Sequence, residues 1–170
     1  MKRALFIGRF QPFHLGHLDA IHQILPKTDH LLIAIGSAES NFIPENPFTA
    51  GERYQMIEAA LTAEKIPRSR YAIIPIRNIE NYGLWVRHVE MLLPPFEKVY
   101  SGSSIVQMLF RKYNKHAVEI IEKKKNINAT EVREAMKRKK NWEQYLPEEV
   151  TKFIKSINGI ERIQAIHTKT

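Results

Sequence analysis

Short apolar segments alternate with amphipathic segments along the first 121 residues. Five segments have the length and composition of buried strands, at Ala4–Ile7, Leu31–Ile35, Tyr71–Ile76, Val99–Tyr100 and Ala117–Ile121. Four stretches between them repeat apolar residues at helical spacing, at Gly16–Leu25, Ala50–Ala63, Leu84–Leu93 and Ser104–Tyr113. This alternation predicts an α/β fold, with a parallel sheet of about five strands and helices on both faces.

After Ile121 the composition changes to a basic, helical C-terminal part. Pro147 is placed for a first helical turn, Val150 to Ile157 provide an apolar face, and Gly159 is expected to end that helix. No repeat, low-complexity segment or linker divides the chain. We therefore predict one domain over residues 1–170, with core elements to about residue 122 and a helical part from about 123 to 170.

The composition is that of an ordinary globular protein, with 44% hydrophobic and 26% charged residues among 170. The sequence shows no apolar run long enough to cross a bilayer and no signal-peptide pattern, so we expect a cytoplasmic protein without membrane contact. Cysteine is absent, which excludes disulfides, thiolate metal sites and cysteine nucleophiles.

The formal net charge of +8 is concentrated in one part of the chain. Residues 111–140 contain eleven Lys or Arg against four Glu, a net of +7. A local excess of this kind indicates a polyanionic ligand or a solvated face. An RNA-binding module is the alternative, but Tyr113 is the only aromatic residue in the stretch, which makes base stacking poor and nucleic acid an unfavoured partner.

The first candidate for chemistry is the segment Gly8–His17, directly after the first apolar run. His14 and His17 are three residues apart at an expected helix start, so their rings should share one side of the first turn. Gly16 between them leaves room for a ligand near the backbone, and a helix start attracts phosphate. A capped, packed helix is the structural alternative. A zinc site would need a third ligand, and none stands at a useful spacing.

This segment resembles the H-x-G-H motif of the nucleotidylyltransferase superfamily. The same letters occur in class I aminoacyl-tRNA synthetases, but the lysine-rich second motif of those enzymes is missing here. Ile127–Arg133 resembles the superfamily's second motif, I-S-S-T-x-x-R, with Asn128 and Ala129 in place of two serines. Asn128 can still cap a helix, and Thr130 and Arg133 should lie on one face of its first turn.

Over nearly its full length the chain resembles the archaeal type of nicotinamide mononucleotide (NMN) adenylyltransferases. Besides the two motifs, the resemblance is carried by Ile35–Ala38, Asn46–Arg53, Leu84–Val86, Pro94–Phe96, Val99–Gly102 and Asn158–Arg162. It implies a Rossmann-like fold, NAD biosynthesis from ATP and NMN, Mg²⁺ or another divalent cation with ATP, and a homo-oligomer, often a hexamer.

The resemblance also implies roles for single residues. His14, His17 and Arg133 would be catalytic. The ATP-binding residues would be Gly8, Arg9, Phe10, His14, Gly16, His17, Ser101, Gly102, Thr130 and Arg133, and the NMN-binding residues Ser37, Arg53, Asn78, Tyr82 and Trp85. Trp85 would stack on the nicotinamide ring. No protein metal ligand is expected, because Mg²⁺ commonly uses substrate oxygens and water.

Two positions depart from the family pattern. Relatives tend to carry aspartate at Asn78 and asparagine at Tyr82, and both belong to the expected nicotinamide pocket. The choice between NMN and nicotinic acid mononucleotide is therefore open, as is a different phosphorylated acceptor such as phosphopantetheine, FMN or a phosphorylated alcohol.

Overall fold

The computed structural model describes residues 1–122 and 126–168, which form two compact units. The sheet unit consists of Met1–Gly8, Ala20–Ala38 and Pro67–Glu122, and the helical unit of Arg9–Asp19, Glu39–Ile66 and the described part of 123–170. The last segment of the helical unit begins where we expected the helical C-terminal part, but this unit also takes in two earlier segments. A single domain over 1–170 stays a prediction.

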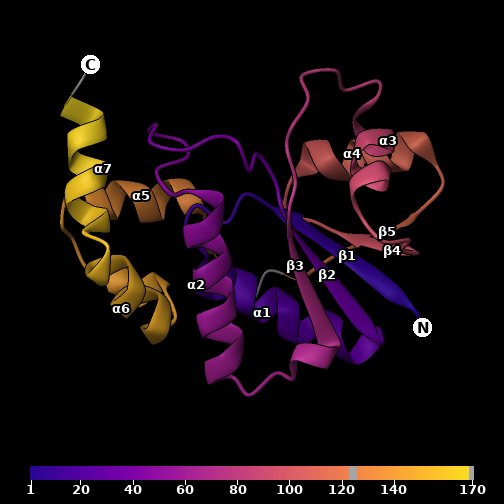
Figure 1. Cartoon of the computed structure of the whole chain (residues 1–170), viewed down its shortest axis with the longest axis horizontal. Coiled ribbons are helices and arrows are strands. Elements are labelled where there is room, and N and C mark those ends of the chain that lie inside the picture. The colour runs from indigo at the N-terminus through magenta and orange to yellow at the C-terminus, as the bar shows by residue number, and fades with distance from the viewer. Residues whose placement is uncertain (123–125, 169–170) are drawn as a thin grey trace. The chain divides into compact units, whose positions relative to one another are not determined.

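The sheet unit is built on five parallel strands within the described residues, as predicted (Figure 1). They are β1 (Arg3–Gly8), β2 (His30–Ile35), β3 (Tyr71–Pro75), β4 (Lys98–Tyr100) and β5 (Ala117–Glu119), in the spatial order β3-β2-β1-β4-β5. The chain adds strands on one side of β1 up to β3 and then on the other side. The carboxyl ends of β1 and β4 therefore border the switch point at which open parallel sheets bind ligands.

Both faces of the sheet are buried. On one face, Leu5 of β1 packs in a cluster with residues of α3 (Trp85–Leu92) and α4 (Ser104–Tyr113), including Val89 and Phe110. Side chains alternate along a strand, so Phe6 faces the other side, and it is buried there too. Burying an aliphatic or aromatic side chain of this size contributes roughly 1.5–3 kcal/mol. The packing therefore fixes the strand ends that carry candidate residues.

The helical unit contains α2 (Ala50–Ala63), α5 (Ala129–Lys137), α6 (Glu148–Ser156), α7 (Gly159–Thr168) and the first half of α1 (Leu15–Ile24). Helix α2 packs against α6, and α7 packs against α5 and α6. The capping box of α2 is present, with Thr49 Oγ1 accepting from the Glu52 amide at 3.1 Å and Glu52 accepting from the Thr49 amide at 2.9 Å. Arg162 of α7 binds both carboxylate oxygens of Glu52 at 2.6 and 2.7 Å, which ties α7 to the start of α2.

The predicted helices and strands are confirmed in type, but some boundaries were wrong. Gly159 does not end α6; that helix ends at Ser156, and Gly159 is the first residue of α7. The left-handed residue in the turn is Asn158, with φ of 52°. A Cβ on Gly159 would lie 2.8 Å from Ile154 Cγ2 and 3.1 Å from Phe48, so glycine is needed there for close packing. Pro147 is the N-cap of α6 rather than part of its first turn.

Candidate functional site

The turn after β1 is held by a left-handed residue, buried rings and a buried glutamine. Phe10 has φ of 52°, a conformation that side chains disfavour. Gln11 is 1% exposed; its Nε2 donates to the Phe48 carbonyl at 2.8 Å and its Oε1 accepts from the Phe48 amide at 3.0 Å. Since a buried amide must satisfy its polar atoms, these two bonds anchor the turn to the segment before α2.

The two histidines of the first motif lie against each other in the helical unit. Their rings stack with centroids 3.6 Å apart and planes inclined by 21°, which confirms the expectation that they share one side of the helix start. The helix itself begins one residue after His14, at Leu15. The amide of His14 donates to Nδ1 of His17 at 3.2 Å, so a neutral His17 carries its proton on Nε2.

Burial keeps both rings uncharged at neutral pH. It lowers the pKa of His14 to about 4. Burial, together with the neighbouring His14, also lowers the pKa of His17 well below its usual value. The histidines can therefore act as neutral hydrogen-bond donors rather than as cations.

Nδ1 of His14 is buried and has no hydrogen-bond partner among the described atoms. A buried polar atom in this state is costly and is typical of a site that a ligand or water completes. Gly16 explains why the ring can lie there, because a Cβ at this position would be 3.0 Å from Cε1 and Nδ1 of His14. The absence of a side chain at Gly16 thus makes room for the His14 ring, and the approach of a ligand to this backbone stays a prediction.

Arg133 comes from α5 and reaches the turn after β1. Asn128 caps α5 by accepting from the Glu131 amide at 2.9 Å, as predicted. One turn further along that helix, Arg133 donates to the Gln11 carbonyl at 2.9 Å and to Thr130 Oγ1 at 3.3 Å. Thr130 and Arg133 therefore share a face, as expected. Burial, followed by the positive charge of Arg9, lowers the pKa of Arg133.

A second buried arginine approaches the same turn. Arg53 is 0% exposed, and its Nη1 donates to the Arg9 carbonyl at 2.9 Å while Nε donates to the Thr49 carbonyl at 3.2 Å. Burial, with a smaller effect of the positive charge of Arg9, lowers the pKa of Arg53 to about 10. The helical unit thus places Arg9, Arg133 and two neutral imidazoles at one turn, a combination suited to phosphate groups, while the Arg53 guanidinium is bound to two backbone carbonyls.

The sheet unit carries the remaining candidates at the carboxyl ends of its strands. Ser101 follows β4, and its Oγ donates to the Ile7 carbonyl at 3.1 Å and accepts from the Ser103 amide at 3.1 Å. Gly102 is exposed, and a Cβ there would meet nothing within 4 Å. Ser37 follows β2 with φ of 49°. The structure brings these residues and Gly8 to one edge of the sheet, which is the edge where such folds bind ligands.

Trp85 begins α3 and belongs to the core of the sheet unit. It is 8% exposed, and its ring meets Phe110 edge-on with centroids 5.9 Å apart. Its Nε1 donates to Asn78 Oδ1 at 2.9 Å. Asn78, one of the two positions that differ from the family pattern, therefore contacts directly the Trp85 ring that we predict to stack on nicotinamide. Tyr82 is 60% exposed, and the loop around it leaves its ring on the surface.

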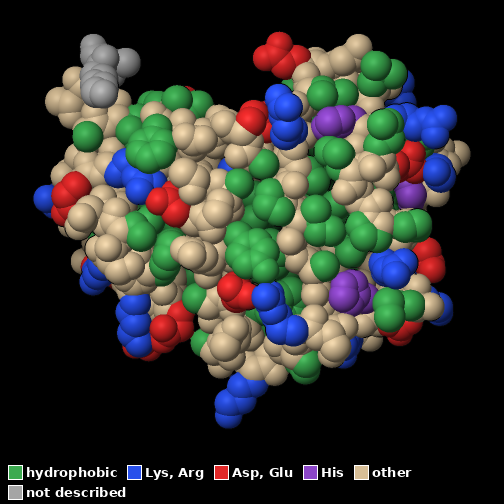
Figure 2. All heavy atoms as spheres, in the orientation of Figure 1, with side chains coloured by type: hydrophobic (Ala, Val, Ile, Leu, Met, Phe, Trp, Pro, Cys, Tyr) green, Lys and Arg blue, Asp and Glu red, His purple; other side chains and the backbone are tan. Residues whose placement is uncertain are grey.

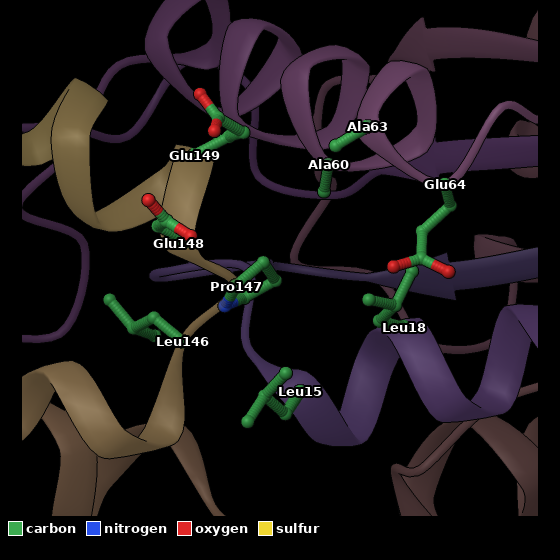
Figure 3. A pocket seen from close by; sticks show the side chains of 9 residues that line it. All are labelled: Leu15, Leu18, Ala60, Ala63, Glu64, Leu146, Pro147, Glu148 and Glu149. Carbon is green, nitrogen blue, oxygen red and sulfur yellow. The ribbon is translucent and has the colours of Figure 1, made fainter.

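A surface pocket in the helical unit contains none of the predicted site residues (Figure 3). Leu15, Leu18, Ala60, Ala63, Leu146 and Pro147 provide its apolar lining, and Glu64, Glu148 and Glu149 add three carboxylates. Carboxylates repel phosphate, so this pocket does not suit a nucleotide. Among the described residues, no group of three or more His, Cys, Asp or Glu could hold a metal ion. No helix in the described part is long and apolar enough to cross a membrane.

Gln11 is the residue that we did not predict as part of the site. It lies inside the first motif, between Phe10 and Pro12. A polar residue among apolar neighbours could have indicated that Gln11 binds buried backbone groups. Its carbonyl binds Arg133 and its side chain binds Phe48, so it connects three segments of the helical unit. Lys123–Lys125, part of the basic stretch, lie outside the described residues.

Comparison of the sequence with known protein families shows which family the chain belongs to. A family model described as cytidylyltransferase-like matches residues 5–135. The chain therefore belongs to the cytidylyltransferase-like family, within the nucleotidyltransferases.

More specific relatives extend the match into the C-terminal helices. A nicotinamide-nucleotide adenylyltransferase from Pyrococcus furiosus is 41% identical over 170 residues, covering 99% of this chain and 90% of that protein. A protein of the same name from Archaeoglobus fulgidus is 42% identical over 169 residues, covering 96% of this chain and 97% of its own length.

A solved structure supports the fold. A bifunctional NMN adenylyltransferase/ADP ribose pyrophosphatase from Francisella tularensis, complexed with AMP and a manganese ion, matches with a TM-score of 0.78 at 26% identity. The match covers 99% of this chain and 53% of that protein, so this chain spans about half of it.

Proposed function

We propose that this chain transfers AMP from ATP to NMN, forming NAD and releasing pyrophosphate. The observation that carries the proposal is the stacked, uncharged His14–His17 pair beside buried Arg133, on the two motifs that the family resemblance assigns to ATP. The full-length similarity to nicotinamide-nucleotide adenylyltransferases supports the same reaction.

The reaction needs no protein nucleophile. A phosphate oxygen of NMN, already an anion, attacks the α-phosphorus of ATP, the α–β bridging bond breaks, and pyrophosphate leaves with the electron pair. What the protein must supply is alignment of two negative molecules and stabilisation of charge on the bridging oxygen. A neutral imidazole suits this role, because Nε2–H of His17 donates a hydrogen bond without transferring its proton.

The arginines offset the remaining charge of ATP. Arg9 and Arg133 would contact phosphate oxygens, with Thr130, Ser101 and the backbone near Gly8, Phe10, Gly16 and Gly102 completing the ATP contacts. A divalent cation would enter with ATP as part of the substrate, because Mg²⁺ commonly uses phosphate oxygens and water as ligands. Mg²⁺ is our proposal for that cation.

Ser37, Asn78, Tyr82 and Trp85 would bind the mononucleotide. The edge of the Trp85 ring is fixed by Asn78, which leaves stacking of one ring face on a pyridinium as its role in binding. Arg53 was predicted in the same group, but its guanidinium is bound to two backbone carbonyls. These residues would also determine whether the protein prefers NMN or nicotinic acid mononucleotide.

We also propose a homo-oligomer, the hexamer that the resemblance implies. Figure 2 shows many apolar side chains exposed on one face of the molecule. In or beside α3 and α4, four large apolar side chains are exposed: Leu84, Met91, Ile105 and Met108. A surface of this kind is suited to burial between copies of the chain. Replacing Met91 and Met108 by Glu should lower the mass measured by light scattering at equal concentration; an unchanged mass would place the interface elsewhere.

The test of the activity is the formation of pyrophosphate and NAD from ATP, Mg²⁺ and NMN. Nicotinic acid mononucleotide, FMN, phosphopantetheine and a phosphorylated alcohol are run in parallel. We expect turnover with a pyridine mononucleotide, abolished by chelating the cation. If only another acceptor is used, the protein is still a nucleotidyltransferase, but the assignment of the pocket to NMN is overturned. Salt-dependent RNA binding without any turnover would favour the RNA-binding alternative.

A further inference from the structure

Arg53 contacts the protein backbone on both sides of its guanidinium. Nη1 donates to the Arg9 carbonyl at 2.9 Å and Nε to the Thr49 carbonyl at 3.2 Å, and the residue is 0% exposed. Arg133 keeps 7% of its surface exposed, whereas Arg53 keeps none, so Arg53, with its fork divided between two carbonyls, has little freedom to turn toward a ligand. The prediction that Arg53 binds NMN therefore needs another interpretation.

The Arg9 carbonyl is one of two that flank the left-handed Phe10. The other, that of Gln11, is bound by Arg133 at 2.9 Å. Phe10 has φ of 52°, which a phenylalanine keeps only where surrounding contacts impose it. The two buried arginines therefore bind the carbonyls of the residues directly before and after the strained Phe10.

Phe10 transmits this restraint to the histidines. Its ring meets the ring of His17 at 72° with centroids 4.8 Å apart, and His17 stacks on His14. The amide of His14 in turn bonds to His17 Nδ1. A shift of the Arg9 carbonyl would move the Phe10 peptide, and with it the direction of the His17 Nε2–H donor.

The support behind Arg53 is rigid. Thr49 is the N-cap of α2 and takes part in its capping box, and Glu52 of that box is bound by Arg162. Burial would raise the pKa of Glu52, but the hydrogen bonds from Arg162 and from the Thr49 amide lower it below its usual value. Glu52 is therefore a carboxylate at neutral pH, and the start of α2 is a fixed base for Arg53.

We propose that Arg53 is a positioning residue, which holds the Arg9 carbonyl so that Phe10 and the His14–His17 pair keep the geometry needed for nucleotidyl transfer. It acts through the turn and does not contact the mononucleotide. The inference rests on the proposed function for its kinetic consequence, whereas the restraint on the turn exists without any substrate.

The test is Arg53→Lys, which keeps the charge but cannot reach both carbonyls with one ammonium group. Arg70→Lys is the matched control, because Arg70 also donates to backbone carbonyls, those of Leu25, Thr28 and Asp29, but in the sheet unit. We expect kcat of Arg53→Lys to fall at least about tenfold with KM for NMN within about twofold of the parent, since misalignment costs rate rather than binding. The control should keep kcat.

Hydrogen exchange without substrate separates this inference from the proposed function. The amides of His17 and Leu18 both bond to the His14 carbonyl, at 2.9 and 3.2 Å, and should exchange faster in Arg53→Lys than in Arg70→Lys. If the parent protein makes no NAD, the exchange result still decides whether Arg53 holds the turn. Unchanged exchange, or a raised KM for NMN with kcat preserved, would overturn the positioning role.

Discussion

Several candidate residues of the helical unit are buried and held by neighbouring groups, whereas two candidates of the sheet unit lie on the surface. In the helical unit, His14, Arg53 and Arg133 are all buried, and each is fixed by ring stacking or by bonds to the backbone. In the sheet unit, Tyr82 and Gly102 are exposed, and a loop or a strand end carries them.

The difference corresponds to two chemical tasks. Aligning and stabilising phosphates requires donors that do not reorganise during the reaction, so their geometry is fixed before substrate arrives. Recognising a base requires surface that the base can still reach. Trp85 differs from these surface residues, because it is 8% exposed and its edge is held by Asn78 within a packed core. If this division holds, the catalytic rate depends on the buried donors of the helical unit and the substrate affinity on residues of the sheet unit.

The largest effect is expected from His17→Ala. The substitution removes the Nε2–H donor and the stacking partner of His14, and loss of one such donor typically lowers kcat by about 100- to 1,000-fold. NAD formation under saturating substrates measures it, with the melting temperature as the control for folding. A kcat within about tenfold of the parent would mean that the fixed geometry of the helical unit does not determine the rate.

A smaller and different effect is expected from Trp85→Phe. The change keeps an aromatic core residue but removes the bond to Asn78 and part of the stacking face. Stacking and cation–π contacts contribute roughly 0.5–2 kcal/mol, so KM for NMN should rise by up to about tenfold with KM for ATP unchanged. Trp142→Phe is the control, because Trp142 is also buried, at 5% exposure, but lies in the helical unit. Equal effects of both variants would assign Trp85 to the core alone.

Gly102→Ala tests whether ATP approaches the end of β4. The added methyl group has open space, so the melting temperature should not change, whereas KM for ATP should rise about threefold if the nucleotide lies against this backbone. Gly16→Ala gives the contrast, because its Cβ would be 3.0 Å from the His14 ring and should lower kcat instead. Unaltered kinetics in Gly102→Ala would remove Gly102 from the ATP contacts.

The smallest functional effect is expected from Glu90→Gln in the sheet unit. Glu90 accepts from Lys115 Nζ at 2.6 Å and from Tyr113 Oη at 3.1 Å, and its Oε1 lies 2.8 Å from His116 Nε2. Burial would raise the pKa of Glu90, but these donors lower it to about 2. The variant should melt about 2–4 °C lower at neutral pH with kcat unchanged.

The pH dependence of this loss follows from linkage. The folded state holds the Glu90 carboxylate ionised, so its contribution is fully present above the unfolded pKa of 4.5 and disappears as the pH falls through about 2. The difference in melting temperature between the parent and Glu90→Gln should therefore shrink over that range. A difference independent of pH would mean that Glu90 stabilises the unit by packing and not by charge.

Much of the fold could be predicted because its signals are local. The α2 capping box, the Asn128 cap and the stacked histidines each join residues three positions apart, and helical geometry alone brings such residues together. The alternation of strands and helices along the chain predicted a parallel sheet, because each strand and each helix could be recognised from its own short segment. The expected end of α6 at Gly159 was wrong because glycine is required there for close packing against Ile154 and Phe48, and the contact with Phe48 joins residues far apart in the sequence.

The sequence by itself determined the elements, their parallel arrangement and the identity of the two motifs, because hydrophobic period and capping residues act within a few positions. Only the tertiary structure decided what the buried polar side chains hold. Arg53 meets the Arg9 carbonyl across 44 residues, Gln11 meets Phe48 across 37, and Arg133 meets the Gln11 carbonyl across 122. Such bonds form where folding brings distant backbone groups together in a space without water, and a buried donor must then bind whichever carbonyl lies there.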